Sequence, residues 1–191
     1  PAAFALSLAF GLVSLGYLIL QLAYNVYLKQ VVILDVFAVA AGFVIRAIAG
    51  GAAIAVPISP WLYICTTLLA LFISLVKRRA ELVTLEENAA QHRDTLEHYT
   101  PALLDQMIAV VTPSTVIAYG LYTFSAPNLP PNHAMMLTIP FVLYGVFRYL
   151  YLAHHHQLGG EPEEVFLTDR PLLADIILWV VASMAILLFF R

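Results

Sequence analysis

Charged side chains inside apolar sequence are the first chemical signal in this chain. Asp35 and Arg46 both belong to the stretch DVFAVAAGFVIRAIAGG, residues 35–51. Eleven residues separate them, which on a helix returns to within about 20° of the same face and places Arg46 roughly 16 Å farther along. An arginine at membrane depth costs at least ~2.5–3.5 kcal/mol to insert, so we expect it to face a polar cavity. Arg46 is therefore a candidate for binding an anionic headgroup; the alternative is a structural ion pair with Asp35 or Asp105.

A second signal is the basic run KRRAEL, residues 77–82, at the end of an apolar segment. Lys77 and Glu81 are i,i+4 neighbours, which puts a cation and a carboxylate side by side on one helix face. Cations at a helix C-terminus also complement the macrodipole, so a simple membrane anchor is the alternative interpretation.

The remaining titratable residues give weaker signals. Arg148 lies within FVLYGVFRYLYL, residues 141–152, and its long side chain either reaches substrate or extends to the membrane surface. Asp105 and Asp175 are expected near helix N-termini, where carboxylates favour the dipole. The consecutive His154, His155 and His156 do not share a helix face, which argues against a metal site built from them alone. Cys65 is the single cysteine, so no disulfide framework or thiol metal cluster is expected.

Several cations with carboxylates at one membrane surface suit a Mg²⁺-diphosphate substrate. Cations hold phosphate oxygens, and carboxylates hold the metal, commonly through water. The sequence thus predicts an enzyme that joins a phosphorylated substrate to a lipid at the cytoplasmic face. The residues that carry this prediction are Lys29, Lys77, Arg78, Arg79, Arg93 and Arg148, with Asp35, Glu81 and Glu87.

The elements that must position these residues are membrane spans. Hydrophobic residues make up 62% of the 191 residues and charged ones 11%, which excludes a water-soluble globule. A net charge of −3 leaves no basic excess for nucleic acid. Apolar segments near 20 residues long predict an all-α, polytopic transmembrane helix bundle that forms a single integral membrane domain over residues 1–191. We expect six spans, at about 3–28, 31–56, 61–82, 102–124, 135–157 and 172–190.

The connections alternate in charge, which predicts topology. Lys29, Lys77 to Arg79 with Arg93, and Arg170 mark the odd junctions, whereas the even ones carry no Lys or Arg. The positive-inside rule places the odd junctions in the cytoplasm. The long connection 83–101 is expected to form a helical cap over the cytoplasmic mouth, with a solvated hairpin as the alternative. Because the chain starts at Pro1 without a signal-peptide pattern, we expect a fragment or a processed form.

Seven segments, in order, carry a resemblance to a known family. They closely resemble decaprenyl-phosphate phosphoribosyltransferases, a branch of the UbiA-type prenyltransferase superfamily, and together they extend along nearly the whole chain. The segments are YNVYLK (24–29), LDVFAVAAGFVIRAIAGG (34–51), SPW (59–61), LFISLVKRRAEL (71–82), HRDTLEHYT (92–100), IPFVLYGVFRYLYL (139–152) and LTDRPLL (167–173).

The resemblance implies a UbiA-type bundle of nine helices, of which this chain matches the last six. It implies transfer of 5-phosphoribosyl from phosphoribosyl diphosphate to a polyprenyl phosphate, with Mg²⁺ and with release of diphosphate. It also implies a multi-pass protein of the inner membrane, active at the cytoplasmic face, that supplies cell-wall arabinan synthesis and is compatible with a homo-oligomer. The family's first Asp-rich motif has no match here, so the isolated chain is expected to be inactive.

The resemblance and the charge pattern together suggest roles for single residues. Lys77, Glu81 and Asp35 are the candidate catalytic residues, and Glu81 is also the one candidate metal ligand. The candidate substrate-binding residues are Tyr24, Lys29, Arg46, Arg78, Arg79, Tyr99 and Arg148.

Two other functions remain open from the sequence. A UbiA-type aromatic prenyltransferase of quinone biosynthesis would share the fold and Mg²⁺, but it would carry DxxxD where KRRAE stands. A non-enzymatic membrane transporter or assembly subunit would use the intramembrane arginine in an ion pathway.

Overall fold

The computed structural model describes residues 8–54, 58–87, 99–127, 129–155 and 162–190. Within them every regular element is a helix, which confirms the predicted all-α class. The elements are α2 (Leu8–Val26), η1 (Leu28–Gln30), α3 (Leu34–Ala53), α4 (Pro60–Glu87), α5 (Pro101–Ser125), η3 (Ala134–Thr138), α6 (Ile139–His155), α7 (Pro162–Thr168) and α8 (Arg170–Phe189).

The helices begin and end within a few residues of the predicted spans, and three differences affect the site or the topology. α4 continues five residues beyond 82, to Glu87, and so extends into the connection predicted as a cap. The rest of that cap, residues 88–98, lies outside the described residues. The fifth span begins as the 3-10 helix η3, and the short helix α7, which the sequence analysis did not predict, precedes α8.

Side-chain caps define where α5 and α8 begin. Thr100 accepts a hydrogen bond from the Leu103 N–H at the start of α5, and Asp169 accepts one from the Leu172 N–H at the start of α8. Such caps satisfy backbone donors that the first helical turn leaves unpaired. Asp105 and Asp175, which were expected at helix N-termini, therefore lie inside their helices and do not cap them.

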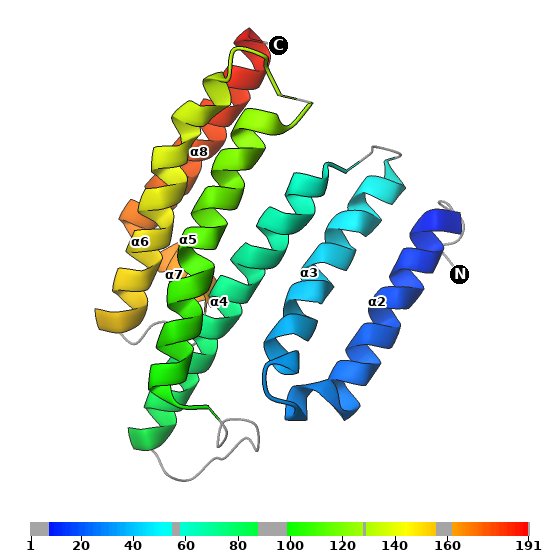
Figure 1. The fold of residues 1–191 in the computed structure, drawn as a ribbon, viewed down its shortest axis with the longest axis vertical. Coiled ribbons are helices and arrows are strands. Elements are labelled where there is room, and N and C mark those ends of the chain that lie inside the picture. Colours follow the sequence, from blue (N-terminus) through cyan, green and yellow to red (C-terminus); the bar gives the residue numbers. More distant parts are fainter. Residues whose placement is uncertain (1–7, 55–57, 88–98, 128, 156–161, 191) are drawn as a thin grey trace.

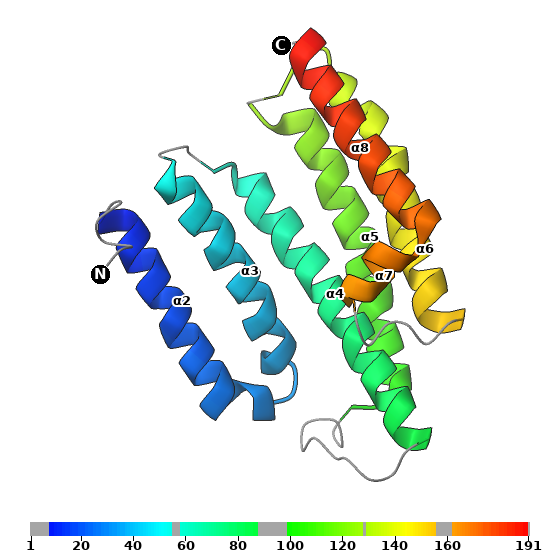
Figure 2. The ribbon, with the colours of Figure 1, turned by 180° about the vertical axis from the view of Figure 1, so that it is seen from behind.

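The helices form an open row. α2, α3 and α4 lie side by side, α5 packs along α4, and α6 packs with α8 at the opposite edge from α2 (Figures 1 and 2). The turn between α2 and α3, the end of α4 and the start of α5 all lie at the lower end in Figure 1. This topology brings Lys29, the basic run of α4 and Asp105 to one end of the bundle.

The hydrophobic core follows α4. Its buried side chains come from α3, α4, α5, α6, α7 and α8 and include Val36, Phe72, Leu75, Leu104, Tyr149, Val165 and Leu172. α2 contributes only Gly11 to the buried residues.

Six of the described helical segments are long and apolar enough to cross a membrane. In each of these segments at most 33% of the residues in the most apolar stretch are buried inside the structure. Large apolar side chains therefore cover the outside of the bundle, as a lipid environment requires. The chain is a multi-pass membrane protein with a helical bundle, as the sequence predicted.

Candidate functional site

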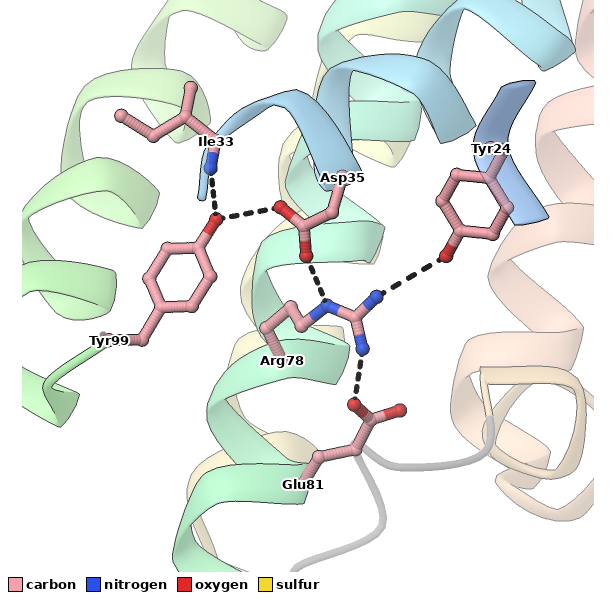
Figure 3. A network of polar contacts seen from close by, with 6 residues as sticks. All are labelled: Tyr24, Ile33, Asp35, Arg78, Glu81 and Tyr99. Carbon is pink, nitrogen blue, oxygen red and sulfur yellow. Dashed lines mark hydrogen bonds and ion pairs between the residues drawn. The ribbon is translucent and has the colours of Figure 1, made fainter. Parts of the chain in front are cut away.

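A buried guanidinium is the centre of the largest polar cluster at the charged end. Arg78 on α4 is 7% exposed. It donates from Nε to Asp35 Oδ2 at 2.9 Å, from Nη1 to Glu81 Oε2 at 2.5 Å and from Nη2 to Tyr24 Oη at 3.5 Å. Figure 3 shows these partners converging on Arg78 from α2, α3 and α4. Three helices are thus joined through one cation.

The second carboxylate oxygen of Asp35 is also bound. The Tyr99 hydroxyl donates to Asp35 Oδ1 at 2.8 Å and accepts a hydrogen bond from the Ile33 N–H at 2.7 Å (Figure 3). Asp35 is fully buried. A buried carboxylate is tolerated where it is paired and hydrogen-bonded, and here both of its oxygens have a partner.

The backbone beside Asp35 is strained. Ile33 has φ 72° and ψ −45°, a left-handed conformation that is rare for a β-branched residue. A residue in such a conformation lowers the stability of the fold by about 1–3 kcal/mol, and the conformation persists where surrounding contacts hold it. Here the Ile33 N–H is held by Tyr99, so the strained turn and the hydrogen-bond network support each other.

Tyr99 lies outside the membrane-spanning helices and is 3% exposed. Burial raises the pKa of its phenol to about 12; the hydrogen bond from Ile33 opposes this shift, and the bond to Asp35 adds to it. At neutral pH the phenol is therefore protonated and acts as a hydrogen-bond donor to Asp35.

Lys77 and Lys29 lie at the same end of the bundle. Lys77 immediately precedes Arg78, is half-buried, and has no ion pair with another described residue. Glu81, which the i,i+4 spacing paired with Lys77, instead forms its i,i+3 ion pair with Arg78. Lys29 lies on η1, directly before α3. Because the ion pairs of Arg78 do not include Lys77, the Lys77 ammonium group is available to bind a ligand at this site.

Arg79 forms an ion pair with Asp105, outside the cluster around Arg78. Its Nε lies 2.5 Å from Asp105 Oδ1, and His154 Nε2 is 3.7 Å from the same oxygen. The pair joins α4 to α5 next to the end of α6. Arg79 thus holds α4 and α5 together at this end of the bundle. Its contact with a substrate stays a prediction.

Arg46 does not join the cluster around Arg78. Its Nη2 donates to Tyr17 Oη at 2.5 Å, and its guanidinium carbon lies 5.1 Å from the ring centroids of Tyr17 and Phe43. The alternative ion pairs with Asp35 or Asp105 are not formed. Arg46 is exposed, so its cation stays accessible at mid-helix depth.

Arg148 forms a two-pronged pair with the α8 cap. Its Nε and Nη2 lie 3.1 and 2.8 Å from the two carboxylate oxygens of Asp169, and Tyr151 stacks on it at 5.3 Å. Because Asp169 also caps α8, Arg148 links α6 to the start of α8. Its role in substrate binding stays a prediction.

The sequence analysis missed the partners of these arginines. Tyr17 and Gln21 were not singled out, yet Gln21 Nε2 donates to Tyr17 Oη at 2.8 Å beside Arg46. With Tyr24 they stand at i, i+4 and i+7, a polar stripe on one face of the otherwise apolar α2, and this spacing was a usable signal. Asp169 gave no comparable signal, because its pair with Arg148 bridges 21 positions.

The described carboxylates do not form a metal cage. No group of three His, Cys, Asp or Glu side chains with metal-binding geometry occurs among the described residues, and both oxygens of Asp35 are committed to protein donors. Mg²⁺ commonly keeps waters and binds through one or two carboxylates plus substrate phosphates. Glu81, with 24% of its side chain exposed, fits such a role as a single ligand.

Comparison with known proteins supplies the chemical context. No family model matches the chain. The chain is 35% identical over 175 residues to the decaprenyl-phosphate phosphoribosyltransferase of Mycolicibacterium smegmatis, with 86% of this chain and 54% of the relative covered. For proteins of the same name, the identity is 34% in Mycobacterium tuberculosis, with 89% and 56% covered, and 31% in Corynebacterium glutamicum, with 86% and 50% covered. The resemblance read from the sequence motifs is confirmed, and the chain spans about half the length of these relatives.

Proposed function

We propose, from this similarity over most of the chain to decaprenyl-phosphate phosphoribosyltransferases, that the protein transfers 5-phosphoribosyl from phosphoribosyl diphosphate to a polyprenyl phosphate such as decaprenyl phosphate. The observation that carries the proposal is the buried cluster of Tyr24, Asp35, Arg78, Glu81 and Tyr99, with Lys77 beside it. All six belong to segments that resemble the family. The product would be a lipid-linked precursor for cell-wall arabinan.

We place the reaction at the cytoplasmic face of the inner membrane. The basic residues of η1 and α4 gather at one end of the bundle, and positive residues favour the cytoplasmic side. Phosphoribosyl diphosphate is strongly anionic and reaches the site from water, so it meets these cations first. The lipid phosphate would lie at the same end, with its apolar chain against the bundle.

The bond changes require little proton transfer from the protein. The bond from ribose C1 to the diphosphate oxygen breaks, and the diphosphate leaves with the electron pair. A lipid phosphate oxygen, already anionic at neutral pH, forms the new bond to C1. Positioning and stabilisation of charge then provide most of the rate enhancement.

The cluster around Arg78 has the parts for this role. Its three charged members, one cation and two carboxylates, carry a formal charge of −1, so it does not attract an anion as it stands. Asp35 is fully buried and stays as the fixed partner, whereas the part-exposed Glu81 is the replaceable one. A substrate phosphate would take the place of Glu81 on Arg78 Nη1 and contact Lys77, leaving the Glu81 carboxylate for a metal.

Other residues complete the proposed roles. Lys29 and Arg46 would hold a substrate phosphate, while Tyr24 would offer its hydroxyl to ribose and Tyr99 would hold Asp35 in place. Mg²⁺, when bound, would neutralise the leaving diphosphate. Since no group of three His, Cys, Asp or Glu side chains among the described residues could hold a metal, and the family's first Asp-rich motif has no match in this sequence, we propose that this chain in isolation is inactive.

The test is transfer of label into lipid. Membranes that contain the full-length parent of this chain are incubated with labelled phosphoribosyl diphosphate and polyprenyl phosphate, with Mg²⁺ or with a chelator. We expect lipid-linked label that needs both substrates and that disappears with chelator. Membranes that insert the protein but form no lipid-linked label would reject the transferase.

Two substitutions test the site itself. Arg46→Ala and Lys77→Ala should each remove most turnover without loss of membrane insertion, because each deletes an accessible cation from a phosphate site. Wild-type rates in both variants would reject these assignments while leaving the reaction intact.

A further inference from the structure

A second buried aspartate lies in a cavity far from the cluster around Arg78. The cavity has a volume of about 570 Å³, opens to the outside of the bundle, and is lined by residues of α4, α5, η3, α6, α7 and α8. This volume falls within the roughly 300–1,000 Å³ of small-molecule sites. None of the six residues drawn in Figure 3 lines it. The cavity is therefore a separate feature of the fold.

Asp175 on α8 lines this cavity and is 9% exposed. It makes no hydrogen bond or ion pair with another described residue. Its Oδ2 lies only 3.0 Å from the position that a Cβ on Gly145 would take, so the carboxylate fits against α6 because residue 145 is glycine. A buried ionisable side chain without a protein partner is rare in a membrane and is commonly functional.

The rest of the wall is apolar and rich in aromatic rings. Phe72, Tyr149 and Phe166 form one cluster: the ring centroid of Tyr149 lies 5.6 Å from that of Phe72 and 5.4 Å from that of Phe166. Tyr119, Tyr122 and Trp179 form the other cluster: the ring centroid of Tyr119 lies 6.0 Å from that of Tyr122 and 6.4 Å from that of Trp179.

Asp175 lies between these two clusters. α6 and α8 run in opposite directions, and Gly145 lies opposite Asp175. Tyr149 is one turn beyond Gly145 toward the charged end, and Trp179 is one turn beyond Asp175 in the other direction. The carboxylate is thus flanked by aromatic rings on both sides along the helix axis.

A buried hydroxyl, that of Ser183, also lines this cavity farther along α8. Asp175, Trp179 and Ser183 follow at i, i+4 and i+8 on one face of α8, so Ser183 lies roughly 12 Å from Asp175 along the axis. Ser183 Oγ is buried without a hydrogen-bond partner among the described residues. Trp179 Nε1 is bound by Tyr119 Oη at 2.8 Å, which holds the indole ring in place along the wall.

These features select the charge of an occupant. A carboxylate repels a phosphate, and no Lys, Arg or His occurs among the described residues that line the cavity. An isoprenoid chain alone would offer Asp175 no hydrogen-bond donor. A carboxylate with aromatic rings on both sides is instead suited to an ammonium group, which an ion pair and cation–π attraction would hold.

We propose that this cavity binds an alkylammonium amphiphile, whose cationic head pairs with Asp175 between the two aromatic clusters while its chain lies along the α8 face of Trp179 and Ser183. The site is distinct from the proposed transferase site, since it favours the opposite charge. Occupants of this class would bind whether or not the protein transfers phosphoribosyl groups.

Trp179 supplies the main readout, because the chain has only two tryptophans. The 191-residue chain is purified in non-ionic detergent as Trp61→Phe, which leaves Trp179, and as Trp179→Phe, which leaves Trp61 outside the cavity lining. Brominated decylamine is titrated into each, with bromodecanol and bromodecyl sulfate of matched chain as probes of other charge. We expect saturable quenching of Trp179 by the amine and only weak, non-saturating quenching of Trp61.

Substitutions at the carboxylate connect binding to charge. In the variant that keeps Trp179, Asp175→Asn should weaken amine binding at least tenfold and leave the alcohol unchanged. Gly145→Ala, which crowds the carboxylate without removing it, should weaken the amine by a smaller factor. The single cysteine, Cys65, also lines the cavity, and bound amine should slow its alkylation.

Three outcomes would overturn the proposal. Equal quenching in both single-tryptophan variants would mean partition of the probe into the micelle. Amine binding that survives Asp175→Asn would remove the carboxylate from recognition. Tighter binding of the sulfate than of the amine would assign the cavity to an anionic lipid.

Discussion

Asp35 and Asp175 are both buried carboxylates on membrane helices, yet their surroundings differ in every respect. Asp35 lies at the charged end, where Arg78 and Tyr99 bind its two oxygens. Asp175 lies among aromatic and aliphatic side chains and has no partner among the described residues. A carboxylate that is fully bound by protein donors positions other groups, whereas one without a protein partner is available to a ligand.

The difference also separates the two proposed sites by charge. The charged end presents cations that suit phosphates, and the cavity presents a carboxylate and ring faces that suit an ammonium. The two proposals thus assign to one chain an anion-binding surface and a cavity of opposite preference.

Matched substitution of the two aspartates should give the largest effect. Asp35→Ala leaves Arg78 buried with one carboxylate fewer, and removal of one partner from a buried pair costs about 3–5 kcal/mol in free energy of unfolding. Asp175→Ala removes no protein partner, so we expect a change below about 1 kcal/mol. Denaturant unfolding in mild detergent measures both values. Equal losses would erase the contrast between the two carboxylates.

A double variant separates stability from chemistry at Asp35. Asp35→Leu combined with Arg78→Met removes both charges together, and such apolar replacement of a buried pair is commonly neutral or stabilising. We expect a stable, inserted protein without transfer activity. Activity in this variant would exclude Arg78 from the transferase site.

The two neighbouring cations Lys77 and Arg79 should also differ. Lys77→Ala should lower kcat/KM for phosphoribosyl diphosphate about 10- to 100-fold, the value of a charge-assisted hydrogen bond, with little change in stability. Arg79→Ala breaks the part-exposed pair with Asp105 and should cost up to about 1 kcal/mol in stability with a smaller loss of transfer. Kinetics and unfolding of the same two preparations distinguish these cases, and a reversed order would exchange their roles.

The charged end should carry a pH dependence through Tyr99. Because its folded pKa of about 12 lies above the ordinary 10.0, the folded state keeps a proton that the unfolded state releases. The stability from Tyr99 is thus complete below pH 10 and is lost as pH rises toward 12. Unfolding midpoints measured from pH 8 to 12 should fall more steeply for wild type than for Tyr99→Phe. Parallel curves would contradict the buried hydrogen bond.

The smallest expected effect concerns the strained turn next to Asp35. Ile33→Gly relieves the positive φ angle, and since the Ile33 side chain is 43% exposed, little packing is lost. We expect a gain of about 1 kcal/mol in free energy of unfolding. Ile33→Ala is the control, because alanine keeps the Cβ and hence the strain. A gain in both variants would place the effect in the side chain instead of the backbone.

Much of the fold followed from sequence because span formation is local. About 20 apolar residues in a row must form a helix in lipid, and each backbone polar group finds its partner within the same segment. The predicted spans therefore correspond to α2, α3, α4, α5, α6 and α8. α7 was missed because seven residues between two polar stretches carry no comparable signal.

The candidate site was predictable in its residues but not in its pairings. Tyr24, Asp35, Arg78, Glu81 and Tyr99 were all singled out, and the structure brings them together. The expected Lys77 to Glu81 pair, and the Arg46 pairs with Asp35 or Asp105, are replaced by other partners. Helical spacing shows which residues share a face, but it does not show what the neighbouring helix offers to that face.

The amino-acid sequence alone determined that this chain crosses a membrane through helices, which of their connections carry basic residues, and which family its segments resemble. The tertiary structure decided which cations are held by carboxylates and which remain accessible, since Arg78 meets Asp35 across 43 positions and Tyr99 meets Asp35 across 64. It also decided that Asp175 faces a cavity. Transfer from water to lipid depends on the composition of one segment, whereas the partner of a buried charge depends on how several helices pack.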